Sequence, residues 1–208
     1  MASSETEIAN LALAHLGHGV EIGSLRTTRS PQALALRLIY DTIRRATLRD
    51  FAWPFAHKIG ALGLVTTYGT DDDHPTAEWK YAYRLPSDCV QFRKIQSGTR
   101  NDTLQSKVKY KISRDDTGWL IFTDMEDAIG EWTIDTEEVE KYPDDFVLAL
   151  SLRLAAYAAP KICREDPFGM RDKAFSMYQR EIAMAQNNGF NEESREEDPA
   201  SELERART

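Results

Sequence analysis

The sequence predicts an α+β protein: an antiparallel helical bundle with an inserted small antiparallel β domain and a flexible C-terminal tail. Helical periodicity dominates both ends of the chain, whereas its middle carries runs in which apolar and polar residues alternate. The end of the chain is too polar to form a core. The predicted parts are residues 1–56 and 142–189 for the bundle, 57–141 for the β domain and 190–208 for a disordered acidic tail.

The N-terminal part of the bundle contains two predicted helices. Ser4 and Glu7 form a capping box that starts the first helix, and Gly17 is suited to end it. Ser30 can cap the second helix, since serine is a preferred N-cap residue, and Pro31 fits the first helical turn, where proline is tolerated. The second helix is amphipathic, with an apolar stripe of Leu36, Ile39, Tyr40, Ile43 and Ala46 and a polar face of Arg37, Asp41, Arg44 and Arg45.

The β domain is centred on residues 79–95. Trp79, Tyr81 and Tyr83 share one parity, which predicts that all three face the core from a half-buried strand. Pro86 interrupts this run, and a second strand follows it. Four to six strands are expected in all. The other candidates are an edge strand around 62–65, a strand over 107–112 with a lysine face, its hairpin partner at 119–123, and a strand over 129–134.

Helical periodicity resumes after Pro143. Residues 146–159 carry a single charge, Arg153, which predicts a helix buried on most sides, in its own bundle or against a neighbouring subunit. Because an unpaired buried charge is costly, we expect Arg153 to pair with a carboxylate, which a neighbouring subunit can supply. A last helix is expected to start at Asp166-Pro167 and to end at residues 187–189.

Composition restricts the class of protein. The chain has 208 residues, 41% hydrophobic and 29% charged, which is ordinary for a soluble globular protein. With a net charge of −8, the chain lacks the excess of basic residues that is typical of a nucleic-acid binder. No apolar run is long enough to span a membrane, and the polar start predicts a protein that stays in the cytoplasm where it is made. Cys89 and Cys163 have no CxxC partner and are expected to be reduced, buried thiols.

The sequence contains no phosphate-binding loop, dinucleotide fingerprint, HExxH helix or GxSxG elbow. Weaker candidates have simple structural interpretations. Asp71, Asp72, Asp73 and His74 are expected to form a solvated acidic loop, and His15 and His18 to lie near a helix end. Asp144 and Asp145 are favourable at a helix N-terminus, and Lys107, Lys109 and Lys111 are expected to form a solvated face. We therefore expect no enzyme, with no catalytic residues, metal or cofactor.

Four stretches occur along the chain in a particular order: residues 8–17, 44–56, 79–89 and 142–146 with the helix that follows. Their sequences include IANLALAHLG, FAWPFA and WKYAYRLPSDC. Together they resemble the head–tail adaptor, or neck and connector, family of tailed bacteriophages, in particular the tail tubular proteins of short-tailed phages. The resemblance covers residues 5–188, and its specificity comes from the joint order of the stretches.

The resemblance implies a non-enzymatic virion protein made in the host cytoplasm. Its family forms a ring of twelve subunits that docks under the portal protein, attaches the tail or nozzle protein and leaves a central channel. Genomic DNA passes through this channel during ejection without sequence-specific binding. The alternatives are another neck, tail-tube or head-closure component, or a glycan hydrolase that uses acids such as Asp71, Asp72 and Asp73.

Five residues are candidates for portal or subunit contacts: Arg153, Phe190, Leu203, Arg205 and Arg207. The last four lie in the acidic tail, and residues 189–208 hold half of the net charge of the chain. Such a segment cannot offset its ordering entropy alone, but it can order on a partner, with Leu203 as its apolar anchor. The alternative is a flexible tail that only increases solubility.

Overall fold

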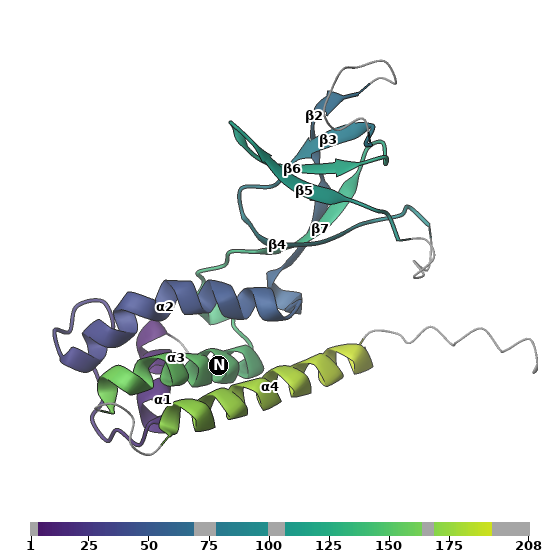
Figure 1. The fold of residues 1–208 in the computed structure, drawn as a ribbon. Coiled ribbons are helices and arrows are strands. Elements are labelled where there is room, and N and C mark those ends of the chain that lie inside the picture. Colours follow the sequence, from purple (N-terminus) through teal and green to yellow (C-terminus); the bar gives the residue numbers. More distant parts are fainter. Residues whose placement is uncertain (1–3, 69–77, 100–106, 164–168, 193–208) are drawn as a thin grey trace, which may run out of the picture.

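The computed structural model describes residues 4–68, 78–99, 107–163 and 169–192, the last four as backbone only. In these residues the chain forms a bundle of helices from which a β domain projects to one side (Figure 1). All described strands lie between the second and third helices in sequence, which confirms the predicted α+β fold with an inserted antiparallel β domain. None of the described helices is long and apolar enough to cross a membrane.

The bundle consists of α1 (Glu5–His15), α2 (Pro31–Asp50), α3 (Asp144–Ile162) and α4 (Met170–Glu192). Both predicted N-caps are confirmed. Ser4 Oγ accepts a hydrogen bond from the N–H of Glu7 at 3.2 Å, and Ser30 Oγ accepts one from Ala33 at 3.2 Å. Gly17 follows α1 with a φ of +70°, a conformation that glycine adopts without strain.

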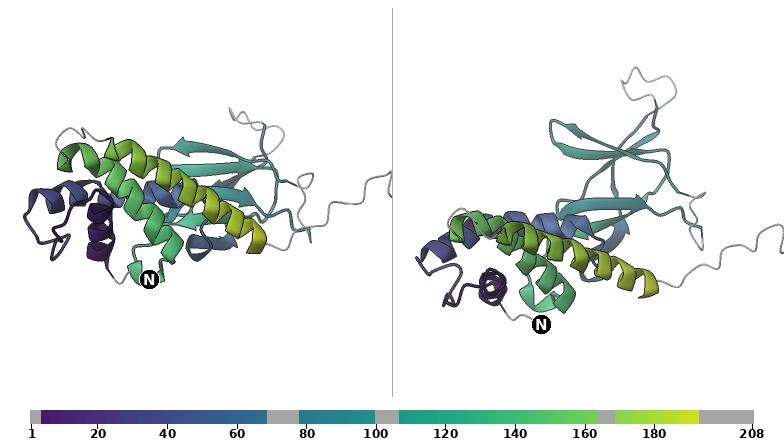
Figure 2. Two further views of the ribbon diagram at one scale, coloured as in Figure 1. Left: turned by 90° about the horizontal axis from the view of Figure 1, so that it is seen from below. Right: turned by 60° about the horizontal axis from the view of Figure 1, so that its bottom comes forward.

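Helix α3 is the centre of the bundle, because it packs against α1, α2 and α4. It runs opposite to α2 and α4, whereas α1 crosses them and is seen nearly end-on in the right-hand view of Figure 2. Its buried residues include Phe146, Leu150, Leu152 and Leu154. The apolar character of α3 is thus explained by burial in its own bundle, so it is no sign of a neighbouring subunit.

The last two helices extend further than the sequence analysis expected, beyond residue 159 for α3 and beyond residues 187–189 for α4. Helix α3 continues through Pro160 to Ile162, and the N–H of Cys163 still bonds to the carbonyl of Ala159 at 2.8 Å, because a proline removes only its own N–H. Helix α4 does not end at residues 187–189 but reaches Glu192. A glycine inside a helix costs about 1 kcal/mol relative to alanine, which is too little to end a long helix.

Residues 190–192 therefore belong to α4 and not to the predicted tail. The rest of the tail, residues 193–208, lies outside the described residues, and so does the predicted start of the last helix at Asp166-Pro167. Both of these stay predictions.

The β domain contains two antiparallel sheets. The three-stranded sheet has the order β1 (His57–Ala61), β7 (Ile129–Ile134) and β4 (Cys89–Ile95). The four-stranded sheet has the order β2 (Gly63–Thr67), β3 (Tyr81–Arg84), β6 (Gly118–Thr123) and β5 (Lys111–Asp115). The predicted β5–β6 hairpin is confirmed. The described strands number seven instead of four to six, because β1 was not predicted: it ends at Ala61, before the edge strand expected around 62–65, which corresponds to β2.

The main β core contains Leu62, Tyr83, Phe92, Ile95, Ile121, Ala128 and Trp132. Tyr81 packs against this core beside Tyr83, as the parity predicts. The prediction for Trp79 is wrong, because Trp79 packs against the cluster of Ala82, Leu120 and Phe122 on the opposite face of the sheet. Strand β3 begins only at Tyr81, so its alternation does not extend back to Trp79.

The predicted strand over 107–112 is only partly correct. β5 starts at Lys111, and residues 107–110 run outside any strand. Lys107 and Lys109 are nevertheless exposed, whereas Tyr110 packs against the β core and donates its hydroxyl hydrogen to the carbonyl of Arg93 at 3.1 Å. The expected exposure of the three lysines is therefore confirmed, and a solvated role for them stays a prediction.

Candidate assembly interface

Arg153 pairs with a carboxylate of its own chain. Its Nη1 lies 2.8 Å from Asp50 Oδ2 at the end of α2 and donates a hydrogen bond to Tyr178 Oη of α4 at 3.0 Å. The guanidinium also lies over the ring of Tyr178. The expected carboxylate partner is thus present, and it ties α2, α3 and α4 together within one subunit. The buried Nε has no hydrogen-bond partner among the described residues.

The other predicted contact residues lie at or beyond the end of the described chain. Phe190 is in the last turn of α4, where only the backbone is described. Leu203, Arg205 and Arg207 lie outside the described residues. The role of these four residues in portal binding therefore stays a prediction.

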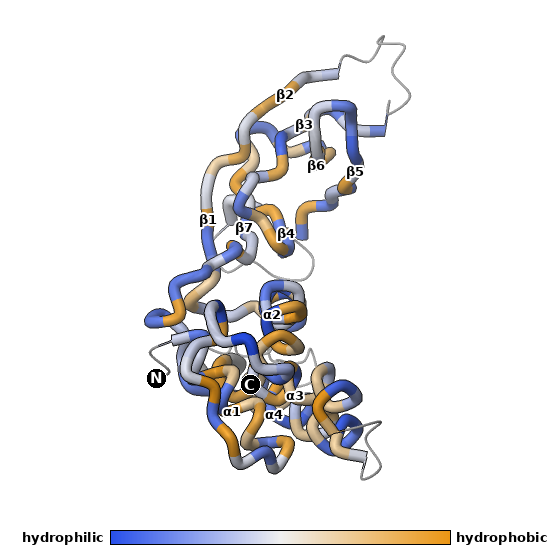
Figure 3. The backbone as a smooth tube through the Cα atoms, turned by 90° about the vertical axis from the view of Figure 1, so that its left-hand side faces the viewer, coloured by the Kyte–Doolittle hydropathy of each residue, from blue (hydrophilic) through white to orange (hydrophobic). Residues whose placement is uncertain are grey.

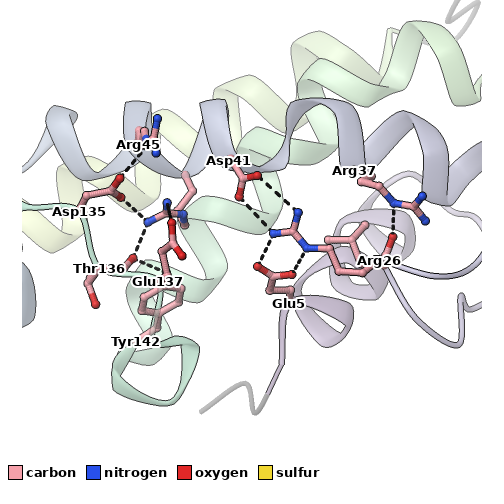
Figure 4. Close-up of polar contacts among 11 residues, drawn as sticks. Glu5, Arg26, Arg37, Asp41, Arg45, Asp135, Thr136, Glu137 and Tyr142 are labelled. Atoms are coloured by element: carbon pink, nitrogen blue, oxygen red, sulfur yellow. Dashed lines mark hydrogen bonds and ion pairs between the residues drawn. The ribbon is translucent and has the colours of Figure 1, made fainter.

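Sequence reasoning missed the residues that hold the β domain on the bundle. Arg44 was expected on the polar face of α2, but its side chain is 2% exposed. It donates hydrogen bonds to Asp135 Oδ1 at 2.6 Å and to the carbonyl of Thr136, in the segment that leaves β7 (Figure 4). Exposed Arg45 binds the other oxygen of Asp135 at 2.8 Å. The prediction for Arg44 is wrong because this returning segment covers that side of α2.

A second arginine completes this junction. Arg93 of β4 donates to the carbonyls of Leu48, Arg49 and Phe51 at the C-terminal end of α2, at 3.1, 3.2 and 2.7 Å. A helix leaves its last carbonyls without intrahelical partners, and a cation is favourable at that negative end. Burial lowers the pKa of Arg93. An arginine nevertheless keeps its charge in proteins, because its ordinary pKa is above 12. Arg44 and Arg93 thus join the β domain to the C-terminal half of α2.

Exposed apolar side chains occur on the bundle and on the β domain. On the bundle they include Leu34 and Leu38 of α2 and Met177 and Met184 of α4. On the β domain they are Ile59, Leu64, Val65, Ile112, Trp119 and Ile129. Single exposed apolar residues are normal, so only a structured arrangement of them indicates a contact surface.

An open groove of about 1010 Å³ lies in the β domain, lined by residues including Lys58, Gly60, Arg84, Asp88, Trp119 and Trp132. Its charged groups are already paired. Lys58 binds Asp88 at 2.7 Å, and Arg84 binds Asp115 at 2.9 Å. The described residues that line the groove therefore offer no unpaired charge to a ligand.

The described residues contain no group of three or more His, Cys, Asp or Glu side chains suited to a metal ion. Cys89 and Cys163 are half-buried, and burial raises the pKa of the Cys89 thiol to about 11. His15 shares a hydrogen bond of 3.1 Å with Ser151, and burial lowers its pKa. The thiols are thus less buried than expected, whereas His15 lies in the last turn of α1, at the helix end that the sequence predicts. The acidic loop at residues 71–74 lies outside the described residues.

Searches against protein-family models and curated proteins find no match for this chain.

Proposed function

We propose that this chain is a head–tail adaptor of a tailed bacteriophage, a structural virion protein without catalytic activity. Twelve copies form a ring that docks under the portal protein, attaches the tail or nozzle protein and leaves a channel for DNA. The proposal is carried by one observation: a complete antiparallel β domain is inserted between two helices of a bundle. This is the architecture implied by the family that the sequence resembles.

The charge of the chain also supports this proposal. A channel lined with many lysines and arginines would bind the DNA phosphates and slow ejection, whereas a subunit with a net charge of −8 avoids such binding. The rigid junction supports it as well, because Arg44 and Arg93 fix the β domain relative to the bundle. A ring subunit needs such a fixed angle between its parts for successive copies to close.

The test is size-exclusion chromatography with light scattering, on the full chain alone and mixed with the portal protein encoded beside it. An adaptor is expected to elute with the portal at the mass of a twelve-subunit ring added to the portal. A protein that stays separate from the portal at every ratio contradicts the proposal. A glycan hydrolase instead stays small and degrades a glycan substrate, which the same samples can be assayed for.

A truncation tests the predicted role of the C-terminal segment. Because α4 extends to Glu192, the cut belongs after that residue and not after Gly189. We expect the shortened chain to keep its melting temperature and to lose most of its affinity for the portal ring. Equal portal binding by both forms would leave the segment as a solubilising tail.

A further inference from the structure

Each sheet of the β domain has two outer strands, and these differ in how they are covered. β4 of the three-stranded sheet packs against α2, and Tyr110 and Gln91 donate to the carbonyls of Arg93 and Phe92. In the four-stranded sheet, β2 and β5 lie at opposite sides of the domain, each with one unpaired side in the described residues (Figure 3). Unpaired edges template the addition of another strand.

A row of side chains crosses the four-stranded sheet from one free edge to the other. The registers place Leu64 of β2 opposite Tyr83, Tyr83 opposite Ile121, and Ile121 opposite Ile112 of β5. Directly paired residues point to the same face of a sheet. The middle of the row is buried, with Tyr83 2% and Ile121 0% exposed, whereas its ends, Leu64 and Ile112, are 57% and 39% exposed. The row therefore stops in solvent at both edges.

Strand direction decides how two copies can join. All neighbours in the four-stranded sheet are antiparallel, and four is an even number, so β2 and β5 run in opposite directions. Copies stacked head to tail therefore bring β5 antiparallel to β2 of the next copy, which continues the alternation. The other sheet has an odd number of strands, three, so its outer strands run in the same direction and the same stacking would pair them in parallel.

Charge favours the same pair of edges. β5 carries Lys111 and Arg114, and its one acid, Asp115, is already paired with Arg84, so two β5 edges would bring net positive charge together. Lysine is also a residue that protects edges against unspecific pairing. β2 carries no charged residue. A β2 edge can therefore receive a β5 edge without like-charge repulsion.

We propose that β2 of one copy pairs antiparallel with β5 of the next, which joins the four-stranded sheets of neighbouring copies into a continuous sheet. Leu64 then lies beside Ile112 of the partner subunit, and the buried row continues through the contact. Such a head-to-tail contact uses two different surfaces and closes into a ring when the rotation between copies allows it. This inference deepens the proposed function and rests on it for the size of the ring.

Cysteine crosslinking tests the contact, in full-length protein with Cys89 and Cys163 replaced by serine. Directly opposed strand residues come close enough for a disulfide. We expect a mixture of the Leu64→Cys and Ile112→Cys variants to give covalent dimers, and the double variant to give a ladder of larger oligomers. Neither single variant should crosslink alone. Dimers of Leu64→Cys alone would show a twofold β2–β2 contact and overturn the inference.

Charge variants supply a second measurement, followed by light scattering over a range of concentrations. Leu64→Lys combined with Ile112→Lys places like charges together and should raise the concentration needed for assembly about tenfold or more. Leu64→Glu combined with Ile112→Lys should restore assembly. The matched control is Ile59→Lys, because Ile59 is 51% exposed on the β1 edge of the other sheet. An equal loss of assembly in this control, or no loss in the Lys/Lys variant, contradicts the inference.

The two proposals fail in different ways. Binding to the portal as a ring without the crosslink overturns the β2–β5 contact and leaves the adaptor function intact. Crosslinked oligomers that do not bind the portal support the contact and contradict the adaptor function. A protein that stays monomeric both alone and in the presence of the portal contradicts both.

Discussion

Arg44 and Arg45 offer a matched test of what burial contributes at the domain junction. Both arginines lie on α2, and both bind the carboxylate of Asp135, at 2.6 and 2.8 Å. Their exposure differs sharply, because the side chain of Arg44 is 2% exposed and that of Arg45 is 57% exposed. The perturbation is the replacement of each by methionine, which keeps an unbranched apolar stem and removes the charged guanidinium group.

The expected magnitudes follow from these contacts. Breaking a buried ion pair by removing one partner costs about 3–5 kcal/mol. Asp135 keeps Arg45, and the carbonyl of Thr136 keeps a hydrogen bond from the hydroxyl of Tyr142 at 2.8 Å, so neither acceptor is left bare. We therefore expect Arg44→Met to lower the free energy of unfolding by about 3 kcal/mol. Arg45→Met breaks an exposed pair and should cost about 1 kcal/mol or less.

The assay is urea denaturation followed by circular dichroism, with the slope of the transition checked for each variant. Asp135→Asn completes a double-mutant cycle with each arginine, and the coupling to Arg44 should exceed the coupling to Arg45. Equal losses for the two methionine variants would refute the reasoning, because they would mean that burial of Arg44 adds nothing to the contact.

Three further predictions concern single side chains. Tyr83→Asp should lower the free energy of unfolding by about 3 kcal/mol or more, because Tyr83 is 2% exposed. Tyr81 is half-buried, so Tyr81→Asp should lower it clearly less. Thermal melting of both variants measures this difference, and equal shifts of the melting temperature would contradict it. Because burial raises the pKa of Cys89 to about 11, its reaction with a thiol reagent at about pH 8 should be slower than in urea, and an equal rate would place the thiol in solvent. Burial lowers the pKa of His15 below its ordinary 6.5, so the unfolded chain binds the proton more readily than the folded chain. The free energy of unfolding should therefore fall as the pH drops through 6.5. His15→Gln should reduce this pH dependence, and an unchanged profile would assign it to other groups.

Local chemistry made several elements predictable from the sequence. Ser4 and Ser30 start helices because a side-chain oxygen accepts from a backbone N–H three residues later. The turn before Gly118 is equally local, since Asp115 Oδ1 accepts from the N–H groups of Thr117 and Gly118. For the candidate interface, the sequence correctly indicated that Arg153 needs a carboxylate, but it could not identify Asp50 as the partner.

Other elements depended on contacts between distant parts of the chain. The alternation at residues 79–83 predicted a buried aromatic face but placed Trp79 on the wrong side, because periodicity does not say where a strand begins. The separation of β1 and β2 into two sheets was equally invisible, since Leu62 between them reads as one more strand residue. Its burial depends on β7 and β4, which supply Trp132 and Phe92 to the same core.

The sequence by itself therefore determined the class of fold, the starts of the first two helices, the β5–β6 hairpin and the need of Arg153 for a counter-charge. Each depends on residues a few positions apart or on the energy of one side chain. Only the tertiary structure decided that Arg44 is buried and that Leu64 and Ile112 end one row across a sheet. Arg44 and Asp135 are 91 residues apart, and such contacts depend on how the whole chain packs. A pattern with the period of a helix or strand carries no information about them.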